Sequence, residues 1–343
     1  LAALTMTANI VTVEGAIPEG TRTDHLGLAI GTSSNSKSNQ SVAIGYASSA
    51  EAPGANPENP ATAVGAGANA NGAGTVALGL SANATGTNAV ALGGGSNGGT
   101  NKTEATAANA TAIGFNAKAS KSGAAAIGSG AKASGSDSIS FGTDTVADSE
   151  KAIAIGAGSK ATNIGATALG RSSAATAASA TAVGSLASAT GTTATAVGIE
   201  ASASGAESLA IGKTASATSG RALAVGTNAK ATGASSVAVG SGAGNSGPLG
   251  FASSINSLGS VVNSLKTINY ATTAEGDYAV ALGVYANAKN SGVAVGQNAL
   301  AATGGVAIGK GVLEDTGNNL AGGVVIGQDS ASTGAYSLAM GRH

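Results

Sequence analysis

Cysteine and tryptophan are absent from this chain of 343 residues, and only two histidines occur, His25 and His343. Without cysteine, neither a disulfide scaffold nor a thiolate metal site can form. Two histidines near opposite ends of the sequence give a histidine-dependent triad almost nothing to be built from. These absences predict a protein that is not an enzyme and that holds no metal or cofactor.

Charge, aromatic side chains and long apolar runs are also scarce. Charged residues make up 10% of the chain, aromatic residues 2%, and the net charge is -1, whereas charged residues are usually about a quarter of a soluble domain. A nearly neutral chain has no basic surface for phosphates, so we expect no nucleic-acid partner. No run of about 18 apolar residues is present, so no membrane-spanning helix is expected. The interior must be built mainly from small and aliphatic residues in thin layers.

What the chain does contain is a repeated pattern in which an alanine and an aliphatic residue precede a glycine. We call these the anchor glycines; they are Gly31, Gly45, Gly65, Gly79, Gly93, Gly114, Gly128, Gly142, Gly156, Gly170, Gly184, Gly198, Gly212, Gly226, Gly240, Gly283, Gly296, Gly309, Gly327 and Gly341. Thirteen of the nineteen intervals between them are 14 residues long. A fixed period over most of a chain is typical of a solenoid, in which each repeat completes the core of its neighbours.

One repeat, residues 76–89, contains Gly79 and Gly86 seven residues apart. Each half of the repeat is long enough for one short strand and one tight corner. Glycine accepts a positive φ without a steric cost, and we therefore expect Gly79 and Gly86 to take that conformation at the two corners. Two strands in every turn predict a flattened β-roll.

The two residues that precede each anchor glycine differ in kind, and strand alternation sends them to opposite faces. The first is alanine in every repeat except at Ser140 and Val325, which predicts a tight buried position, with Ala82 and Ala84 opposite it inside the roll. The second is always apolar and would then point outward. We call this set the aliphatic column; its members include Ile44, Leu78, Leu92, Ile113, Ile127, Ile155, Leu169, Val183, Val197, Ile211, Val225 and Val239.

A continuous apolar column cannot remain in water, so it predicts a partner surface. The most economical partner is another copy of the same chain around a rotational axis. The opposite arrangement remains an alternative at this point: a monomeric solenoid with the aliphatic residues inside and the alanines outside.

The segments Ser41–Gly45 and Asn88–Gly93, followed by x-x-Ala-x-Ala-x-Gly, resemble the head repeat of trimeric autotransporter adhesins, the YadA-like head. The resemblance covers residues 28–343 apart from one insertion. It implies an all-β, left-handed parallel β-roll assembled as a homotrimer on the outer membrane of a Gram-negative bacterium. It also implies attachment to host extracellular matrix of the collagen, fibronectin and laminin class, to host cells or to other bacteria. The family's neck, stalk and C-terminal membrane anchor do not appear in the sequence, so we expect a head fragment.

Four departures from the period divide the chain. We expect an N-terminal cap over residues 1–27, roll repeats over 28–240, an insertion over 241–276 and further repeats over 277–343. Shorter surface loops are expected within 46–64, 94–113 and 310–326. In the large insertion, apolar residues fall at heptad-like spacing and predict a short helix over 251–268: Phe251, Ile255, Leu258, Val262 and Leu265. An extended excursion is the alternative, because the frequent serine and asparagine residues lower helix propensity.

Other solenoid functions fit the residues less well. Calcium-binding rolls need aspartate after each Gly-x-Gly, and hexapeptide acyltransferases use six-residue faces and a catalytic histidine. Ice-binding rolls need a uniform threonine column, whereas the outward column of the second strand varies, as Asn83, Val146 and Ser188 show. A monomeric ice-binding or scaffold solenoid is nevertheless the main alternative function. The same column contains candidate residues for an anionic matrix ligand, which could also be merely solvated: Lys118, Lys132 and Lys160.

Overall fold

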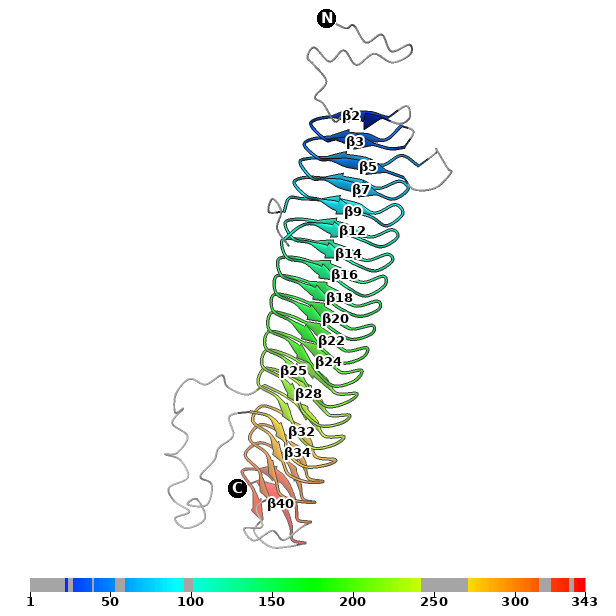
Figure 1. The fold of residues 1–343 in the computed structure, drawn as a ribbon. Helices are drawn as coiled ribbons and strands as arrows, with labels where there is room; N and C mark the ends of the chain where they lie inside the picture. Colours follow the sequence, from blue (N-terminus) through cyan, green and yellow to red (C-terminus); the bar gives the residue numbers. More distant parts are fainter. Residues whose placement is uncertain are drawn as a thin grey trace, which may run out of the picture. The chain divides into compact units, whose positions relative to one another are not determined.

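The computed structural model describes residues 22–23, 27–38, 40–52, 59–95, 101–241, 271–314, 322–332 and 336–342, and all regular elements in these ranges are β-strands. The chain forms two compact units, residues 1–144 and 145–343. Each unit is a parallel β-solenoid in which even-numbered strands form one sheet and odd-numbered strands form the other (Figure 1). Among the described residues, no helix is long and apolar enough to cross a membrane.

In the first unit, each sheet has eight short strands. The even sheet consists of β2 (Leu28–Ile30), β4 (Val42–Ile44), β6 (Thr62–Val64), β8 (Val76–Leu78), β10 (Val90–Leu92), β12 (Thr111–Ile113), β14 (Ala125–Ile127) and β16 (Ile139–Phe141). The odd sheet consists of β1 (Arg22–Thr23), β3 (Asn35–Ser36), β5 (Ser49–Glu51), β7 (Asn69–Asn71), β9 (Asn83–Ala84), β11 (Glu104–Ala105), β13 (Lys118–Ala119) and β15 (Lys132–Ala133). Strand β1, from the expected cap, pairs with β3.

The second unit continues the same alternation. Its even sheet consists of β18 (Ile153–Ile155), β20 (Thr167–Leu169), β22 (Thr181–Val183), β24 (Thr195–Val197), β26 (Leu209–Ile211), β28 (Leu223–Val225), β30 (Val237–Val239), β32 (Val280–Leu282), β34 (Val293–Val295), β36 (Val306–Ile308), β38 (Val324–Gln328) and β40 (Leu338–Arg342). Its odd sheet consists of β17 (Val146–Ala147), β19 (Lys160–Ala161), β21 (Ala174–Ala175), β23 (Ser188–Ala189), β25 (Ser202–Ala203), β27 (Ser216–Ala217), β29 (Lys230–Ala231), β31 (Thr273–Ala274), β33 (Asn287–Ala288), β35 (Leu300–Ala301), β37 (Leu313–Glu314) and β39 (Ala331–Ser332).

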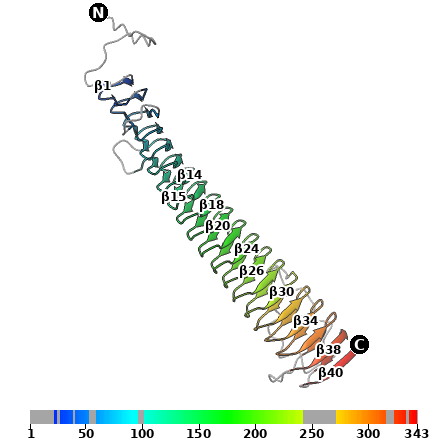
Figure 2. The ribbon, with the colours of Figure 1, turned by 90° about the vertical axis from the view of Figure 1, so that its right-hand side faces the viewer.

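The pairing register places equivalent positions of successive turns side by side. Leu78 pairs with Leu92, for example, one 14-residue period later. The register also continues across the largest departure from the period, because Val239 pairs with Leu282 and Lys230 with Thr273. In Figure 2 the labelled even strands of the second unit follow one another without a change of direction. The roll is therefore continuous from the strands before the large insertion to the strands after it. The short helix expected over 251–268 lies outside the described residues.

Alanine fills the interior of the roll. In the turn around β8 and β9, Ala77, Ala82, Ala84 and Ala89 are all completely buried. A methyl group at each inward position lets the two sheets approach closely and pack without voids. The expectation that the alanines lie inside is confirmed, and the reversed arrangement, with aliphatic residues inside, is wrong.

Several of the polar residues that replace alanine inside the roll form hydrogen bonds through their hydroxyls, whereas the buried hydroxyl of Ser159 has no partner. The buried hydroxyls of Thr75 and Ser138 donate to the carbonyl oxygens of Gly72 and Gly135, each at 2.7 Å. Ser140, which stands in the alanine position before Gly142, accepts a hydrogen bond from the Lys132 amide at 3.2 Å. Because a buried hydroxyl costs free energy unless it is bonded, these contacts explain why the exceptions are tolerated.

The two glycines of a repeat serve different purposes. Gly79 has a φ of +126°, and a Cβ there would overlap the carbonyl of Gly93 in the next turn. Gly86 has no such positive φ, so the expectation for this residue is wrong; a Cβ at Gly86 would instead overlap the backbone of Ala107. The left-handed residue of that corner is Asn88, with a φ of 58°. Asparagine tolerates this conformation better than most side chains, so the corner does not require glycine there.

Candidate functional site

The outer face of the even sheet carries two columns of side chains, one that is apolar in every turn and one that is apolar in most turns but holds threonine in five of them. One is the aliphatic column. The other, which we call the flanking column, holds the residue three before each anchor glycine, such as Val76, Val90 and Ile153. Both point away from the buried alanine between them, as the burial pattern of β10 shows. The side chains of the aliphatic column are half-buried or exposed in the single chain, and Phe141 is 51% exposed.

Large exposed apolar side chains are distributed unevenly around the roll. We call the residues that follow the anchor glycine the first corner, and those that lead from the odd sheet back to the even sheet the second corner. The large exposed apolar side chains on the even sheet are Leu78, Ile139, Phe141, Ile155, Ile211, Leu282, Ile308, Leu338 and Met340. Those at the first corner are Tyr46, Phe115, Leu186, Ile199 and Val284, and those at the second corner are Ile164, Tyr278 and Tyr336. In the described part of the chain, none lies on a strand of the odd sheet.

The exposed large apolar side chains are therefore concentrated on the even sheet and at the two corners. Isolated apolar side chains on a surface need no explanation, but contiguous ones mark sites that a partner covers. Stacked strands bring the aliphatic residues of neighbouring turns about 4.8 Å apart, so the column is contiguous within each unit. The aliphatic column therefore lies where the sequence predicted it, on the outside of the roll.

The candidate lysines lie on the outer face of the odd sheet but do not form one continuous ladder. Lys118 and Lys132 are paired residues of β13 and β15 in the first unit. Lys160, in the second unit, pairs with Val146 on one side and Ala174 on the other. The sequence placed all three in one column, and the structure brings only the first two together.

An acidic side chain lies beside the lysine pair. Glu104, on β11, has its Oε2 3.5 Å from the Lys118 Nζ and its Oε1 3.3 Å from the Lys102 Nζ. Since β11 is the neighbour of β13, this carboxylate offsets part of the positive charge of that face. Any anionic ligand would have to compete with Glu104 for Lys118.

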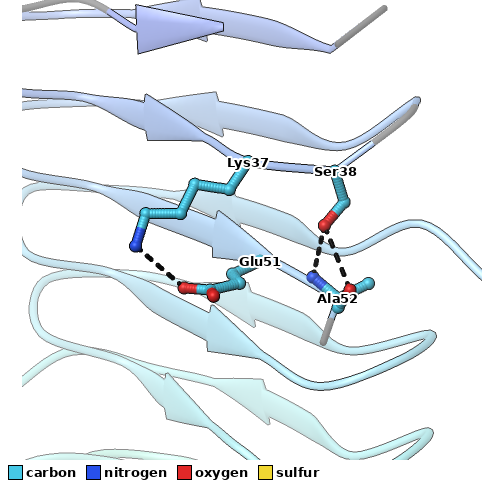
Figure 3. Close-up of polar contacts among 4 residues, drawn as sticks. All are labelled: Lys37, Ser38, Glu51 and Ala52. Carbon is cyan, nitrogen blue, oxygen red and sulfur yellow. Dashed lines mark hydrogen bonds and ion pairs between the residues drawn. The ribbon is translucent and has the colours of Figure 1, made fainter. Parts of the chain in front are cut away.

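A second ion pair lies at the base of the expected loop within 46–64. Lys37 and Glu51 occupy the same position in consecutive turns, with 3.0 Å between Nζ and Oε2. Ser38 accepts a hydrogen bond at 2.6 Å from the amide of Ala52, the last described residue before that loop (Figure 3). Exposed ion pairs of this kind stabilise by well under 1 kcal/mol, so these contacts position the chain rather than hold the fold together.

The described residues contain no group of three or more histidine, cysteine, aspartate or glutamate side chains that could hold a metal ion. His25 and His343 both lie outside the described residues.

Two surface features escaped sequence reasoning. The flanking column follows from strand alternation, because residues two apart share a face, and that signal was available. The other is a hydroxyl column beside the lysine-containing one in the second unit, half-buried at Thr162 and exposed in the next five turns; it consists of Thr162, Thr176, Thr190, Ser204, Thr218 and Thr232. This column could have been found from the sequence by checking every outward position of the repeat for threonine, and not only the column that contains Asn83, Val146 and Ser188.

The chain was compared with known families and proteins. It matches the family described as YadA head domain repeat (2 copies) over more than half of its length. The matched residues are 26–55, 60–82, 70–96, 105–131, 133–159, 161–187, 189–215, 217–243, 270–286 and 274–299. A search of curated proteins found no match.

Proposed function

The chain belongs to the YadA head family, and we propose that three copies bury their even sheets against one another to form the head of a surface adhesin. The observation that carries this proposal is the aliphatic column, which is apolar in every repeat yet lies on the outside of the single roll. Covering it with identical columns from two further copies removes apolar surface from water without requiring a second protein.

The proposed trimer assigns different tasks to the two sheets. The even sheet faces the axis, and the odd sheet, which carries lysine, serine, threonine and asparagine, faces the surroundings. We expect this outer surface and its loops to attach to host extracellular matrix of the collagen, fibronectin or laminin class, to host cells or to other bacteria. Lys118, Lys132 and Lys160 are candidates for contacts with anionic groups of such ligands.

Because the outer surface repeats in every turn, many weak contacts can together attach the head to a ligand. Three copies in one head, and many heads on one cell, would bind an extended ligand at several places simultaneously, and such linkage raises the overall affinity without a deep pocket. A location on the outer membrane of a Gram-negative bacterium completes the proposal. The family and the fold are of an adhesive, structural type rather than an enzymatic one.

Light scattering tests the assembly. A trimer has three times the chain mass of 31.6 kDa, about 95 kDa, and a stable species of 31.6 kDa in dilute solution would refute the proposal. A solid-phase panel of collagen, fibronectin and laminin tests attachment, with a Lys118→Glu, Lys132→Glu variant to assess the lysine face. A trimer that binds no member of the panel would exclude the matrix ligands and leave cells and other bacteria as targets.

The hydroxyl column favours one second candidate, binding to ice or to another ordered hydroxylated surface. Thr176, Thr190, Ser204 and Thr218 occupy successive turns at the strand spacing of about 4.8 Å, which gives a regular array of exposed hydroxyl groups. Thermal hysteresis measured for the chain and for a Thr190→Lys variant distinguishes this function. Absence of hysteresis in the unmodified protein would eliminate it.

A further inference from the structure

Two of the four insertions lie at the first corner, and at both of them the chain returns to the roll at a threonine. The corner that begins after Gly93 ends at Thr103, and the corner that begins after Gly240 ends at Thr272. Both threonines are completely buried and stand directly before a strand of the odd sheet. In an uninterrupted repeat the third residue after the anchor glycine holds this place, as Ala82 does. The two insertions therefore end at the same structural position.

The hydroxyl group of each of these threonines bonds to the next turn of the roll. Thr103 Oγ1 donates to the carbonyl oxygen of Gly114 at 2.6 Å, and Thr272 Oγ1 donates to that of Gly283 at 2.7 Å. In both cases the acceptor is the anchor glycine of the following turn. The same bond therefore closes a short insertion in the first unit and a long one in the second.

Uninterrupted first corners are closed within their own turn. Ser34, Ser48 and Ser173 donate to the anchor glycine of the turn to which they belong, at 2.7 to 3.0 Å. The backbone makes the same link, as the amide of Ala82 does at 3.3 Å. Most uninterrupted corners hold alanine in this place, and the buried hydroxyl of Ser159 has no partner. A hydroxyl group is therefore dispensable at such a corner.

The conformation of the anchor glycine separates the two kinds of corner. Gly93 and Gly240 have φ values of 149° and 150°, whereas the anchor glycines of the uninterrupted corners before Gly327 have values between 114° and 135°. Gly327 itself has a φ of 149°, and Ser330 beside it donates to the carbonyl oxygen of Gly341 at 2.7 Å, although no residues are inserted there. We call these three corners open and the others closed. All three open corners hold a hydroxyl that bonds to the next turn, and serine supplies it as well as threonine.

The bond to the next turn has a physical reason at an insertion. The three-residue turn that links a closed corner to its own anchor glycine is interrupted there. A hydroxyl bonded across to the next turn fixes the returning chain in a way that does not depend on the residues in between. Because the buried hydroxyl is paired with a carbonyl oxygen, the link also avoids the cost of an unsatisfied polar group.

We propose that an open first corner with such a hydroxyl is an insertion site, at which the roll carries an added segment without needing it for folding. The segments attached after Gly93 and Gly240 are then display elements, which can differ in length and composition while the strands beside them stay in register. The pairing of Val239 with Leu282 across the longer insertion is the register that this attachment preserves. The inference goes beyond the proposed adhesin function and does not depend on the trimer.

Deletion of residues 242–270 tests the proposal. Gly240 and Gly283 are 43 positions apart, and 43 minus the 29 deleted residues restores the 14-residue period. Hydrogen exchange of single amides is the measurement, because turns of a solenoid open locally and a melting temperature averages over all of them. The reporters are the amides of Lys230, which donates to the Thr272 carbonyl at 2.8 Å, and Thr273. Their exchange should be unchanged by the deletion.

Substitution of the threonine shows whether the hydroxyl acts through the insertion. In the complete chain, Thr272→Val should accelerate exchange of the reporter amides about three- to tenfold, as expected for the loss of one hydrogen bond. Thr272→Ser should change it less than about twofold, since Ser330 makes the same bond. In the deletion variant, Thr272→Val should have little effect, because the backbone then closes the corner as it does at Ala82.

A Thr103→Val variant repeats the test in the first unit and covers the case in which one variant fails to fold. Its reporter is the amide of Asn83, which donates to the Thr103 carbonyl at 2.9 Å. Equal responses to Thr272→Val with and without residues 242–270 would overturn the proposal, as would no response in either protein or faster exchange on deletion alone. Light scattering establishes that the compared variants share one oligomeric state, so a monomeric roll would refute the proposed trimer and leave this test intact.

Discussion

Ala77 and Leu78 are adjacent in β8, yet Ala77 is completely buried whereas Leu78 is 37% exposed. The smaller residue forms the core and the larger one lies on the surface, the reverse of the arrangement in most globular proteins. This inversion follows from the spacing of the two sheets, which leaves room for a methyl group and nothing larger at most inward positions. Substitutions at these two positions should therefore have opposite kinds of effect, one on folding and the other on assembly.

Enlarging an inward alanine should destabilise the roll. Ala196 lies between Thr195 and Val197 in β24 and is completely buried, so Ala196→Leu should lower the free energy of unfolding by about 3 kcal/mol or prevent folding, because overpacking displaces the neighbouring turns. Urea denaturation followed by circular dichroism measures the change. The control Ser202→Leu places the same side chain on the outward side of β25, where a change below about 0.5 kcal/mol is expected.

Charging the aliphatic column should dissociate the assembly while the roll stays folded. Ile211, in β26, is exposed in the single chain, and Ile211→Asp would bring three carboxylates together near the proposed axis, in surroundings that disfavour charge. We expect light scattering to show monomers with unchanged circular dichroism. Ser216→Asp, on the outward face of β27, should leave the trimer intact. Trimers that persist in Ile211→Asp would place the interface on another face.

The repeating features of the fold could be predicted from the sequence because each structural position occurs in many repeats, and the residues found there show what it accepts. A column that accepts alanine almost everywhere, beside one that accepts only larger apolar residues, identifies the inside and the outside without coordinates. The continuous register between Val239 and Leu282 was less accessible. The sequence showed that extra residues separate Gly240 from Gly283. The strand pairing shows in addition that the strands on the two sides of this insertion are direct neighbours.

Features that depend on the distance between turns were not accessible. Gly86 was expected to supply a left-handed conformation, but it is required because the neighbouring turn leaves no space for a Cβ. Identical residue types can therefore serve different physical purposes within one repeat.

Asn88 should tolerate glycine and reject β-branched residues, the opposite of an ordinary strand position. Its φ is 58°, which glycine adopts freely and valine does not. Asn88→Val is expected to lower the free energy of unfolding by about 1 to 2 kcal/mol, and Asn88→Gly to change it by a few tenths. Thermal melting of the two variants checks the difference. Equal melting temperatures would show that this corner relaxes to accommodate the side chain.

Removing the acid beside the lysine pair should strengthen any contact with anions. Glu104→Gln deletes the carboxylate beside Lys102 and Lys118, so the variant should elute from heparin at higher salt than the unmodified protein, and Lys132→Gln at lower salt. Because these groups are partly exposed, stability should change by less than about 1 kcal/mol in either variant. Identical elution of all three proteins would show that this face does not contact sulfated polysaccharides.

Leu186→Asn should stabilise the single roll and weaken the trimer. Asparagine relieves the left-handed leucine and should raise the free energy of unfolding by about 1 kcal/mol in the monomeric Ile211→Asp background. In the assembled protein the same change removes an exposed apolar side chain from the first corner, beside the even sheet that the proposed trimer covers, so dissociation on dilution should begin at a higher protein concentration.

Tyr278→Asn provides the matched control, because Tyr278 is also left-handed, with a φ of 56°, but lies at the second corner. It should stabilise the monomer to a similar extent and leave dissociation unchanged, since the second corner is outside the proposed interface. Opposite responses of the two variants in a dilution series would therefore separate conformational relief from loss of contact. If both variants weaken the trimer equally, then both corners lie within the interface, and the neighbour covers a larger part of the roll than the even sheet and the first corner.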